Sequence, residues 1–441
     1  MKASGLCVAL CLGGLALAEE PMPAVPTEDG ELPTGVVGEH IGDSLFESGS
    51  LGDHRMDALA AAEAELHGRA QPGAGRWKVA PHLDLKAAWD DNIFIQPRDE
   101  QADTILIASP GLAFGFWDSS ERFESWLYRD KRASRDDRSS GNFAVFDYTL
   151  ALVKFTDHDS EDSVDHDAAF DAQWTSSKLT LGARFRFKDG TNADVDIGGR
   201  VRRRVSTAVA EAKYEVSERV SVQTSVEFTR SEPEGFTNAT EVRSESWFNY
   251  LLTPQISTGL GAAFGHVSVE DAPGDTYQQV LARAGYTATE KVSFRASGGV
   301  EFRQSDSSGG DETTPVFEVR FAYEPTEKTK AYVEAYRRIS NSALEAGRDY
   351  LTTGVSARVR HQLWPGVFLM CDGGYEEADY AETVRGANRR DQYFYVRPGV
   401  QWNFAPWGNA QLTYQHRENE STFDSNTFAN NQVELQISLS F

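Results

Sequence analysis

Cysteine, long apolar runs and positive charge are all scarce in this sequence. It has three cysteines in 441 residues, and Cys7 and Cys11 fall within the apolar N-terminal stretch. Cys371 alone cannot form an internal disulfide, which excludes a disulfide-stapled fold. No apolar run is long enough for a membrane-spanning helix, which excludes a helical membrane protein. The formal net charge of -24 argues against a nucleic-acid partner.

The N-terminus has the pattern of an export signal. Lys2 gives a charged start, residues 6–17 an apolar stretch, and Ala16-Leu17-Ala18 a small-residue cleavage site. We therefore expect residues 1–18 to be a signal peptide and the mature chain to begin at Glu19.

Residues 19–76 differ from the rest in charge. Twelve acidic side chains face only Arg55 and Arg69 up to residue 75. This composition predicts an acidic periplasmic arm that is mostly disordered, with a short helix near residues 54–67 and Asp53 as its N-cap. A docking helix or a pore plug is the functional alternative for the same segment.

From residue 77 onward the chain consists of alternating apolar and polar residues. The last nine residues, 433–441, alternate without a break and end on Phe441. A period of two is that of a β-strand, and a barrel in lipid needs a complete last strand because an open sheet edge would leave backbone groups unsatisfied. A terminal Phe also resembles the sorting signal of bacterial outer-membrane barrels, so we expect the barrel-assembly machinery to bind this strand.

Short and long connections alternate along residues 77–441, as periplasmic turns and extracellular loops do in outer-membrane barrels. Counting back from the terminal strand predicts an all-β fold, a transmembrane antiparallel β-barrel of about 18 strands, with 16 as the alternative. Residues 118–141 carry Phe123, Trp126 and Leu127 at helical spacing. We interpret 118–141 as a periplasmic insertion with a short helix. The outward faces would contact outer-membrane lipid and lipopolysaccharide.

Many charged residues fall on the predicted lumen-side faces. One hypothesis is a polar, water-filled channel whose charges filter solutes. The alternative is that the charges pair across neighbouring strands and solvate the interior. The predicted lumen-lining residues are Arg184, Arg186, Lys188, Arg283, Arg295, Arg303, Arg320, Arg338, Arg358, Arg360, Arg397, Arg417, Glu227, Glu301, Glu318, Glu334, Asp372 and Glu434.

The densest acidic segment, residues 157–167, is the one candidate for binding a metal. Carboxylates at this density suit Ca²⁺, but the segment lacks the ligand spacing of an EF-hand, and a solvated extracellular loop explains it as well. The candidate ligands are Asp157, Asp159, Glu161, Asp162 and Asp165. Histidines fall on separate strands without evident Ser and Asp partners, and no phosphate-binding glycine loop occurs. We therefore expect neither an enzyme nor a cofactor.

Two short motifs resemble the opening of the putative beta-barrel porin 2 family. Residues Trp89, Asp90, Asp91, Asn92 and Phe94 match the end of that family's first strand. Its second strand is matched by Ser109, Pro110 and Gly111. The resemblance implies an outer-membrane barrel of unassigned substrate, and some similar barrels accompany polysaccharide-export components.

These features together predict an outer-membrane, porin-like channel for passive passage of polar or charged solutes, or a secretion conduit for exported polysaccharide. A structural or adhesive barrel that displays its loops is the alternative, and an outer-membrane enzyme is a third.

Overall fold

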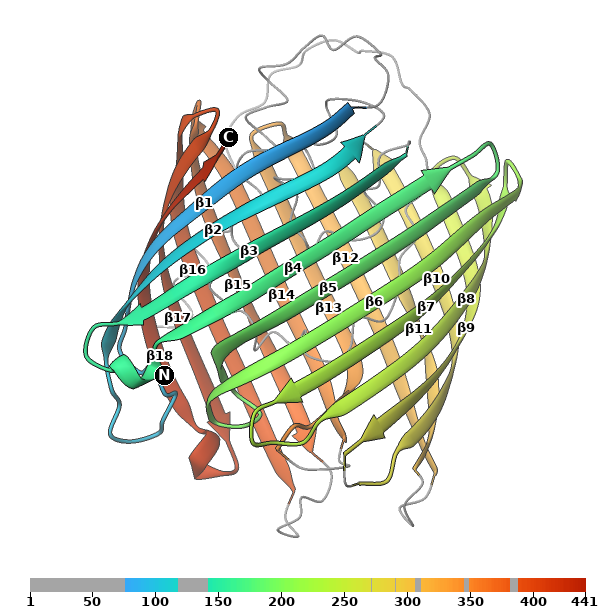
Figure 1. Ribbon diagram of the computed structural model, residues 1–441. Coiled ribbons are helices and arrows are strands. Elements are labelled where there is room, and N and C mark those ends of the chain that lie inside the picture. The colour runs from blue at the N-terminus through green and yellow to red at the C-terminus, as the bar shows by residue number, and fades with distance from the viewer. Residues whose placement is uncertain are drawn as a thin grey trace.

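The computed structural model describes residues 76–117, 142–270, 272–289, 291–305, 311–344, 349–380 and 388–441. In these residues the protein is one closed antiparallel β-barrel of 18 strands (Figure 1). The predicted leader, the acidic arm with its helix, and the 118–141 insertion lie outside the described residues. None of the described helices is long and apolar enough to cross a membrane.

Each strand pairs with its neighbours in sequence, and β1 closes the ring by pairing with β18. The predicted count of 18 is confirmed. The strands are β1 (Arg76–Asp90), β2 (Asp103–Trp117), β3 (Phe143–Phe155), β4 (Ser163–Thr175), β5 (Leu179–Asp194), β6 (Gly199–Ser217), β7 (Val220–Pro233), β8 (Ala239–Thr253), β9 (Ile256–Val269), β10 (Asp275–Thr289), β11 (Val292–Ser305), β12 (Asp311–Thr326), β13 (Thr329–Asn341), β14 (Asp349–Trp364), β15 (Val367–Tyr380), β16 (Arg389–Ala405), β17 (Gly408–Ser421) and β18 (Phe428–Ser440). Two 3-10 turns, η3 (Asp159–Glu161) and η4 (Asp424–Asn426), lie in the connections before β4 and β18.

The ring closes where the sequence predicts it. β1 and β18 pair from His82 opposite Ser440 to Asp90 opposite Gln432. The backbone N–H of Phe441 also donates to the carbonyl of Pro81 at 3.0 Å. Because every strand has two neighbours, the barrel exposes no open edge to lipid.

The two ends of the barrel differ in their connections. At one end, near the C-terminus in Figure 1, hairpins such as β14–β15 and β16–β17 turn within a few residues. Several of these hairpins shift register just before the turn, for example between Gln362 and Trp364, as a bulged tight turn does. We call this the turn end and the opposite end the loop end. Short turns face the periplasm in outer-membrane barrels, so the loop end is extracellular.

Alternation along each strand separates an apolar outer face from a polar inner face. Leu435 is 47% exposed and Val226 48% exposed, whereas their sequence neighbours Glu434 and Glu227 are buried. An exposed belt of large apolar side chains would be unstable in water and is what lipid requires. The strands have 13 to 19 residues, more than the ten or so needed to cross the bilayer, so their ends extend beyond it.

Exchange of an outer residue for arginine tests this assignment of faces. Leu435→Arg should impair outer-membrane assembly, because arginine on the lipid face near the midplane costs about 2–4 kcal/mol. Gln432→Arg, on the inner face of the same strand, is the matched control and should assemble like the wild type. The readout is the folded fraction in outer-membrane preparations. Equal yields of the two variants would contradict the assignment.

Candidate functional site

The candidate site is the interior of the barrel and its loop-end mouth. All the predicted lumen-lining charged residues lie on the inner face, opposite the exposed apolar belt, where they are buried or half-buried. Some pair across strands as the alternative interpretation expects. Arg397 Nη2 donates to Asp372 at 2.8 Å on the neighbouring strand, and Lys86 Nζ lies 3.2 Å from Glu434. The interior is therefore polar and partly self-neutralised.

Charges on β8, β10 and β11 near the loop end form a buried network. Arg243 Nη2 donates to Glu245 at 2.6 Å and to Gln279 at 2.9 Å. Gln279 Nε2 donates to Glu301 at 2.6 Å, and Arg303 Nε donates to the same carboxylate group at 2.8 Å. Buried charges are tolerated only when paired, so this network gives the wall its shape.

Arginine side chains also lie over aromatic rings of the interior. The guanidinium carbon of Arg283 lies 4.2 Å from the ring centre of Trp247, and that of Arg360 lies 3.9 Å from Phe368. Similar pairs join Arg338 with Tyr336 and Arg389 with Tyr380, as follows from the affinity of a planar cation for an aromatic face. These contacts orient guanidinium groups along the wall.

The connection between β5 and β6 crosses the mouth. Pairing of β4 with β5 ends at His166 and Asp189, whereas β5 and β6 stay paired to Asp194 and Gly199. Residues 190–202, which we call the strap, therefore project beyond the neighbouring strands. β14 lies nine strands from β5 in a ring of 18, so a strap that contacts the β13–β14 connection has reached the opposite wall.

One buried carboxylate makes that contact. Asp196 accepts hydrogen bonds from Ser342 Oγ at 3.0 Å, from the backbone N–H of Ala343 at 2.7 Å and from that of Leu344 at 3.3 Å. Burial raises the pKa of Asp196, while Arg389 and the amide donors oppose the rise. The carboxylate thus ties together two loops from opposite sides of the barrel.

Arg389, at the start of β16, holds the strap backbone. Its guanidinium donates to the carbonyls of Asp196 at 2.7 Å and Val195 at 3.1 Å, and to Asp391 at 3.0 Å. Asn426 Nδ2 donates to the same two carbonyls at 3.1 Å. Paired hydrogen bonds from one side chain to two neighbouring carbonyls fix the position of the strap backbone as well as stabilising it.

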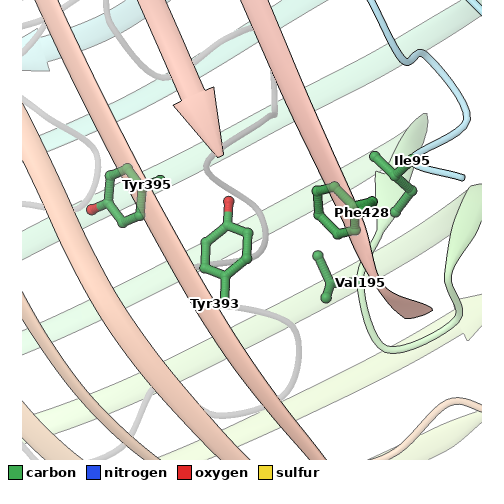
Figure 2. Packing of buried hydrophobic residues seen from close by; sticks show 5 residues of the cluster. All are labelled: Ile95, Val195, Tyr393, Tyr395 and Phe428. Carbon is green, nitrogen blue, oxygen red and sulfur yellow. The ribbon is translucent and has the colours of Figure 1, made fainter. Parts of the chain in front are cut away.

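Apolar packing reinforces the anchor. Figure 2 shows Val195 beside Phe428, with Tyr393 and Tyr395 of β16 nearby and Ile95 from the β1–β2 connection. Ile95 has a φ of 49°, which β-branched residues rarely adopt, and its fully buried side chain holds it there. The strap is therefore anchored by a small core as well as by polar contacts.

Two further contacts join loops at this end. The guanidinium of Arg200 donates to Glu161 at 3.1 Å and lies 4.8 Å from the Phe155 ring centre, so the strap also contacts β3 and η3. The backbone N–H of Thr237, after β7, donates to the carbonyl of Ala343 at 3.2 Å. The loops thus meet over the mouth.

The Asp-Asn part of the first motif fastens the seam between β1 and β18. Asp91 accepts hydrogen bonds from Asn431 through its backbone N–H and its Nδ2, both at 2.7 Å. Asp90 accepts from the backbone N–H of Asn92 at 2.8 Å and from Asn430. Asn92 Nδ2 also donates to the carbonyl of Ala429 at 3.0 Å. Trp89, 47% exposed, lies on the outer face, and the half-buried Phe94 packs against the Ile93 cluster.

The second motif, on β2, makes room for a buried contact between a histidine and an aspartate. His82 of β1 lies opposite Gly111, and a Cβ at Gly111 would come within 1.9 Å of its ring. His82 Nε2 reaches past β2 to Asp147 of β3 at 2.9 Å. Ser109 and Pro110 make no pairs with β3, as expected where proline offers no N–H.

The acidic segment gives no metal centre. The described residues contain no group of three or more His, Cys, Asp or Glu side chains placed to hold a metal ion. Asp162 binds Lys154, which lowers the pKa of that carboxyl, and Glu161 binds Arg200. Asp165 accepts from Ser163 at 2.8 Å, and Asp157 donates its backbone N–H to Asp103. Asp159 begins η3.

Phe441 packs at the turn end, where its ring stacks on Trp407 with centres 6.1 Å apart. Sequence reasoning did not identify the strap or its anchors Asp196, Arg389 and Asn426. Their only trace in the sequence is an apolar Val195 and Ile197 within a long polar connection.

A closed 18-strand barrel with a lipid-facing belt and a polar interior defines a β-barrel membrane protein of the porin type. The model of the family described as Putative beta-barrel porin 2 matches residues 238–441, and this confirms the predicted family. The match lies outside the two motifs at residues 89–111 that first indicated it. Fold and family indicate a porin-like barrel of the bacterial outer membrane.

No curated protein matches the sequence. Solved structures similar to this chain include Pseudomonas aeruginosa OpdK with vanillate (TM-score 0.43, 12% identity, 82% of this chain and 98% of that chain). OpdO of the same organism gives a TM-score of 0.43 at 13% identity, covering 83% of this chain and 97% of that chain. Acinetobacter baumannii OccAB4 gives 0.43 at 10% identity, with 82% and 98% covered. Similarity at this level identifies no solute.

Removal of the Asp91 carboxylate should weaken the seam. Asp91→Ala loses two hydrogen bonds that join the β1–β2 connection to β18, so the free energy of unfolding should fall by about 1–3 kcal/mol. Denaturant titration of the refolded barrel measures this. Glu100→Ala, an exposed position in the same connection, is the control and should leave stability unchanged. An equal effect of both variants would contradict the seam's role.

Proposed function

We propose that the protein is a passive channel for polar or charged solutes whose extracellular mouth is narrowed by the strap. The observation that supports it most is the combination of a polar inner wall with one connection pinned across the opening. A ring of 18 strands encloses more space than its own side chains fill, so water and solutes have room between the walls. Nothing in the proposed flow requires an energy source.

A secretion conduit for exported polysaccharide is the second candidate. The meeting of loops over the mouth favours it, because a wide conduit must be kept closed while no polymer passes. The predicted acidic arm at residues 19–75 would then close the periplasmic side. A barrel that only displays its loops remains the alternative without transport.

The predicted partners follow from the same surface. We infer that the exposed belt contacts outer-membrane lipid, that the rim at the loop end contacts lipopolysaccharide, and that the terminal strand ending in Phe441 is recognised by the barrel-assembly machinery. The paired strand and the exposed Phe441 ring support the last of these.

Planar-bilayer conductance of the purified protein, with and without residues 19–75, tests the channel. Steady conductance in both forms is the expected result for a porin. Conductance only after the deletion supports a plugged conduit. Absence of conductance in both forms contradicts transport and leaves the loop-display function.

The strap gives a separate prediction. Asp196→Ala leaves Ser342 and two backbone amides without their acceptor, at about 1–3 kcal/mol for each buried group, so the strap should detach from the β13–β14 connection. Single-channel conductance should then rise, and proteolysis within residues 190–202 should become faster.

Glu234→Ala, an exposed carboxylate in the next loop, is the matched control and should change neither measurement. If Asp196→Ala detaches the strap by the proteolysis test yet conductance stays the same, the strap does not limit the mouth.

A further inference from the structure

The pairing between β12 and β13 ends early on the loop-end side. It runs from the turn as far as Phe317 opposite Arg337 and stops there. Both strands continue toward the loop end, β12 with residues 311–316 and β13 with residues 338–341. On their other sides these segments stay paired, with β11 and with β14. We call the gap between the two segments the notch.

Pro315 accounts for the point at which the pairing stops. The backbone N–H of Glu324 donates to the carbonyl of Lys291 on β11 at 2.7 Å. Because the backbone groups of successive residues point to opposite sides of a strand, the odd-numbered residues of β12 point toward β13. The next bonded pair of the ladder would join Pro315 with Ile339. Proline has no N–H to donate to the carbonyl of Ile339, so the ladder ends.

The β13–β14 connection is also drawn away from β12. Asp196 of the strap accepts hydrogen bonds from residues 342–344, directly after β13. Arg303 of β11 binds Asp349 at the start of β14, although β12 and β13 lie between their strands. The contacts that dock the strap therefore also keep the end of β13 apart from β12.

The notch lies where the apolar belt ends. Thr313 and Pro315 are exposed, and Thr313 is level with Phe302, the last large apolar side chain on the outer face of β11. Across the notch, Ile339 is level with Leu351 of β14. Hydrocarbon gives way to lipid headgroups at this boundary, so headgroups can satisfy backbone groups that the ladder leaves open. Below the notch both strands keep two neighbours.

A cation lies at the base of the notch. Arg337 is on the outer face and half-buried, opposite the outer-facing Phe317. Its Nη1 lies 3.5 Å from Thr353 Oγ1, and its Nε is buried without a partner in the described residues. Glu377, the next carboxylate along this register, is bound by Arg390. An arginine at the edge of the lipid is stabilised by an anion, and the described residues supply none.

The notch also holds acceptors that need donors. The Oδ1 of Asn341 is buried and receives no hydrogen bond from the described residues. The carbonyl of Ile339 lacks the N–H that Pro315 does not have. A ligand that fits the notch carries an anionic group for Arg337 and hydroxyl groups for these acceptors. A phosphorylated sugar has both.

We propose that the notch binds the phosphorylated sugar headgroup of lipopolysaccharide in the outer leaflet. The guanidinium of Arg337 takes the phosphate through paired N–H donors, and sugar hydroxyls donate to Asn341 and Ile339. The acyl chains continue along the apolar belt. The proposal gives the lipopolysaccharide contact inferred above a defined site, and it rests on the extracellular orientation of the loop end.

The test measures binding of diphosphoryl lipid A to the purified full chain in detergent, by native mass spectrometry. Arg337→Gln should raise the Kd about threefold to tenfold, between the strength of an exposed ion pair and that of a charge-assisted hydrogen bond. Dephosphorylated lipid A should bind the wild type as weakly as the variant binds diphosphoryl lipid A. Arg219→Gln, an exposed cation at the turn end, is the control and should change the Kd less than about twofold.

Three results of this measurement would overturn the proposal. An equal effect of Arg337→Gln and Arg219→Gln would mean that total charge sets the affinity. Equal binding of dephosphorylated lipid A would exclude the phosphate. Equal binding of phosphatidylglycerol would exclude the sugar and with it the assignment to lipopolysaccharide.

Closing the notch should also weaken binding. Pro315→Val supplies the missing N–H, so the ladder should extend to Ile339 and the Kd for lipid A should rise, while the thermal midpoint without lipid stays equal or rises. Pro325→Val, at the turn end of the same strand, is the matched control and should leave the Kd unchanged. Wild-type affinity in Pro315→Val would contradict the site.

Nitroxide labels measure the notch directly. In a Cys371→Ser background, dipolar broadening between labels on Thr313→Cys and Asn341→Cys should be weaker than between labels on Phe321→Cys and Val333→Cys. The second pair faces each other in the ladder of the same two strands. Equal broadening would show that the strands do not separate and would overturn the proposal.

Failure of this site is distinguishable from failure of the channel. Arg337 lies outside the lumen, so Arg337→Gln should leave single-channel conductance unchanged. A changed conductance would place the side chain in the pore and overturn the lipid site. Absence of conductance in the wild type contradicts transport alone, because lipid A binding is measured without it.

Discussion

Closure of the ring between β1 and β18 is the constraint on which everything else in this barrel depends. In lipid each unpaired backbone N–H or carbonyl costs several kcal/mol, so the first and last strands must find each other. Their pairing extends over nine residue pairs, compared with fifteen between β1 and β2. The shorter seam is fastened at both ends, by Asp91 and Asn431 at the loop end and by the Phe441 N–H on Pro81 at the turn end. Of the two motifs at residues 89–111, the first thus joins the seam and the second lets His82 of β1 reach Asp147 of β3.

The charged residues of the inner wall differ in burial between the two ends of the barrel. Near the loop end, the buried pairs Arg243–Glu245 and Arg303–Glu301 are joined through Gln279, so they hold β8, β10 and β11 in place. Near the turn end, the side chains of Arg320 and Lys330 are 36% and 42% exposed on the inner face and still lie close to carboxylates. A buried pair contributes mainly specificity of structure, because desolvation offsets most of its attraction. A half-exposed pair is screened by water and contributes less to stability.

The barrel was predictable from the alternation of apolar and polar residues along the strands. The loop contacts that form the mouth have no such pattern and were not predicted. Alternation with a period of two survives in every strand because one face meets lipid and the other water, and the alternation of short and long connections gave the count of 18. Contacts between loops have no period. Nothing in the sequence around Asp196 distinguishes it from the many other acidic loop residues, and Arg389 lies almost 200 positions away. The charged inner-face residues were predictable individually. Which of them face each other across neighbouring strands depends on the strand register, and an error of one residue in the register would move each side chain to the other face of the sheet. In the acidic segment at 157–167, the density of carboxylates suggested a metal site. In the structure, several of these carboxylates instead bind Lys154, Arg200 and a backbone N–H group.

The position of the strap decides where the proposed channel would be narrowest. The strap docks on the β13–β14 connection and on Arg389 at the loop end. A solute entering from outside would meet the strap before the charged inner wall. A polymer leaving the cell would have to displace the strap last. The strap is held by Asp196, Arg389 and Asn426 and by a small apolar cluster, all at the loop end, so these contacts can break together without disturbing the strand pairing of the wall.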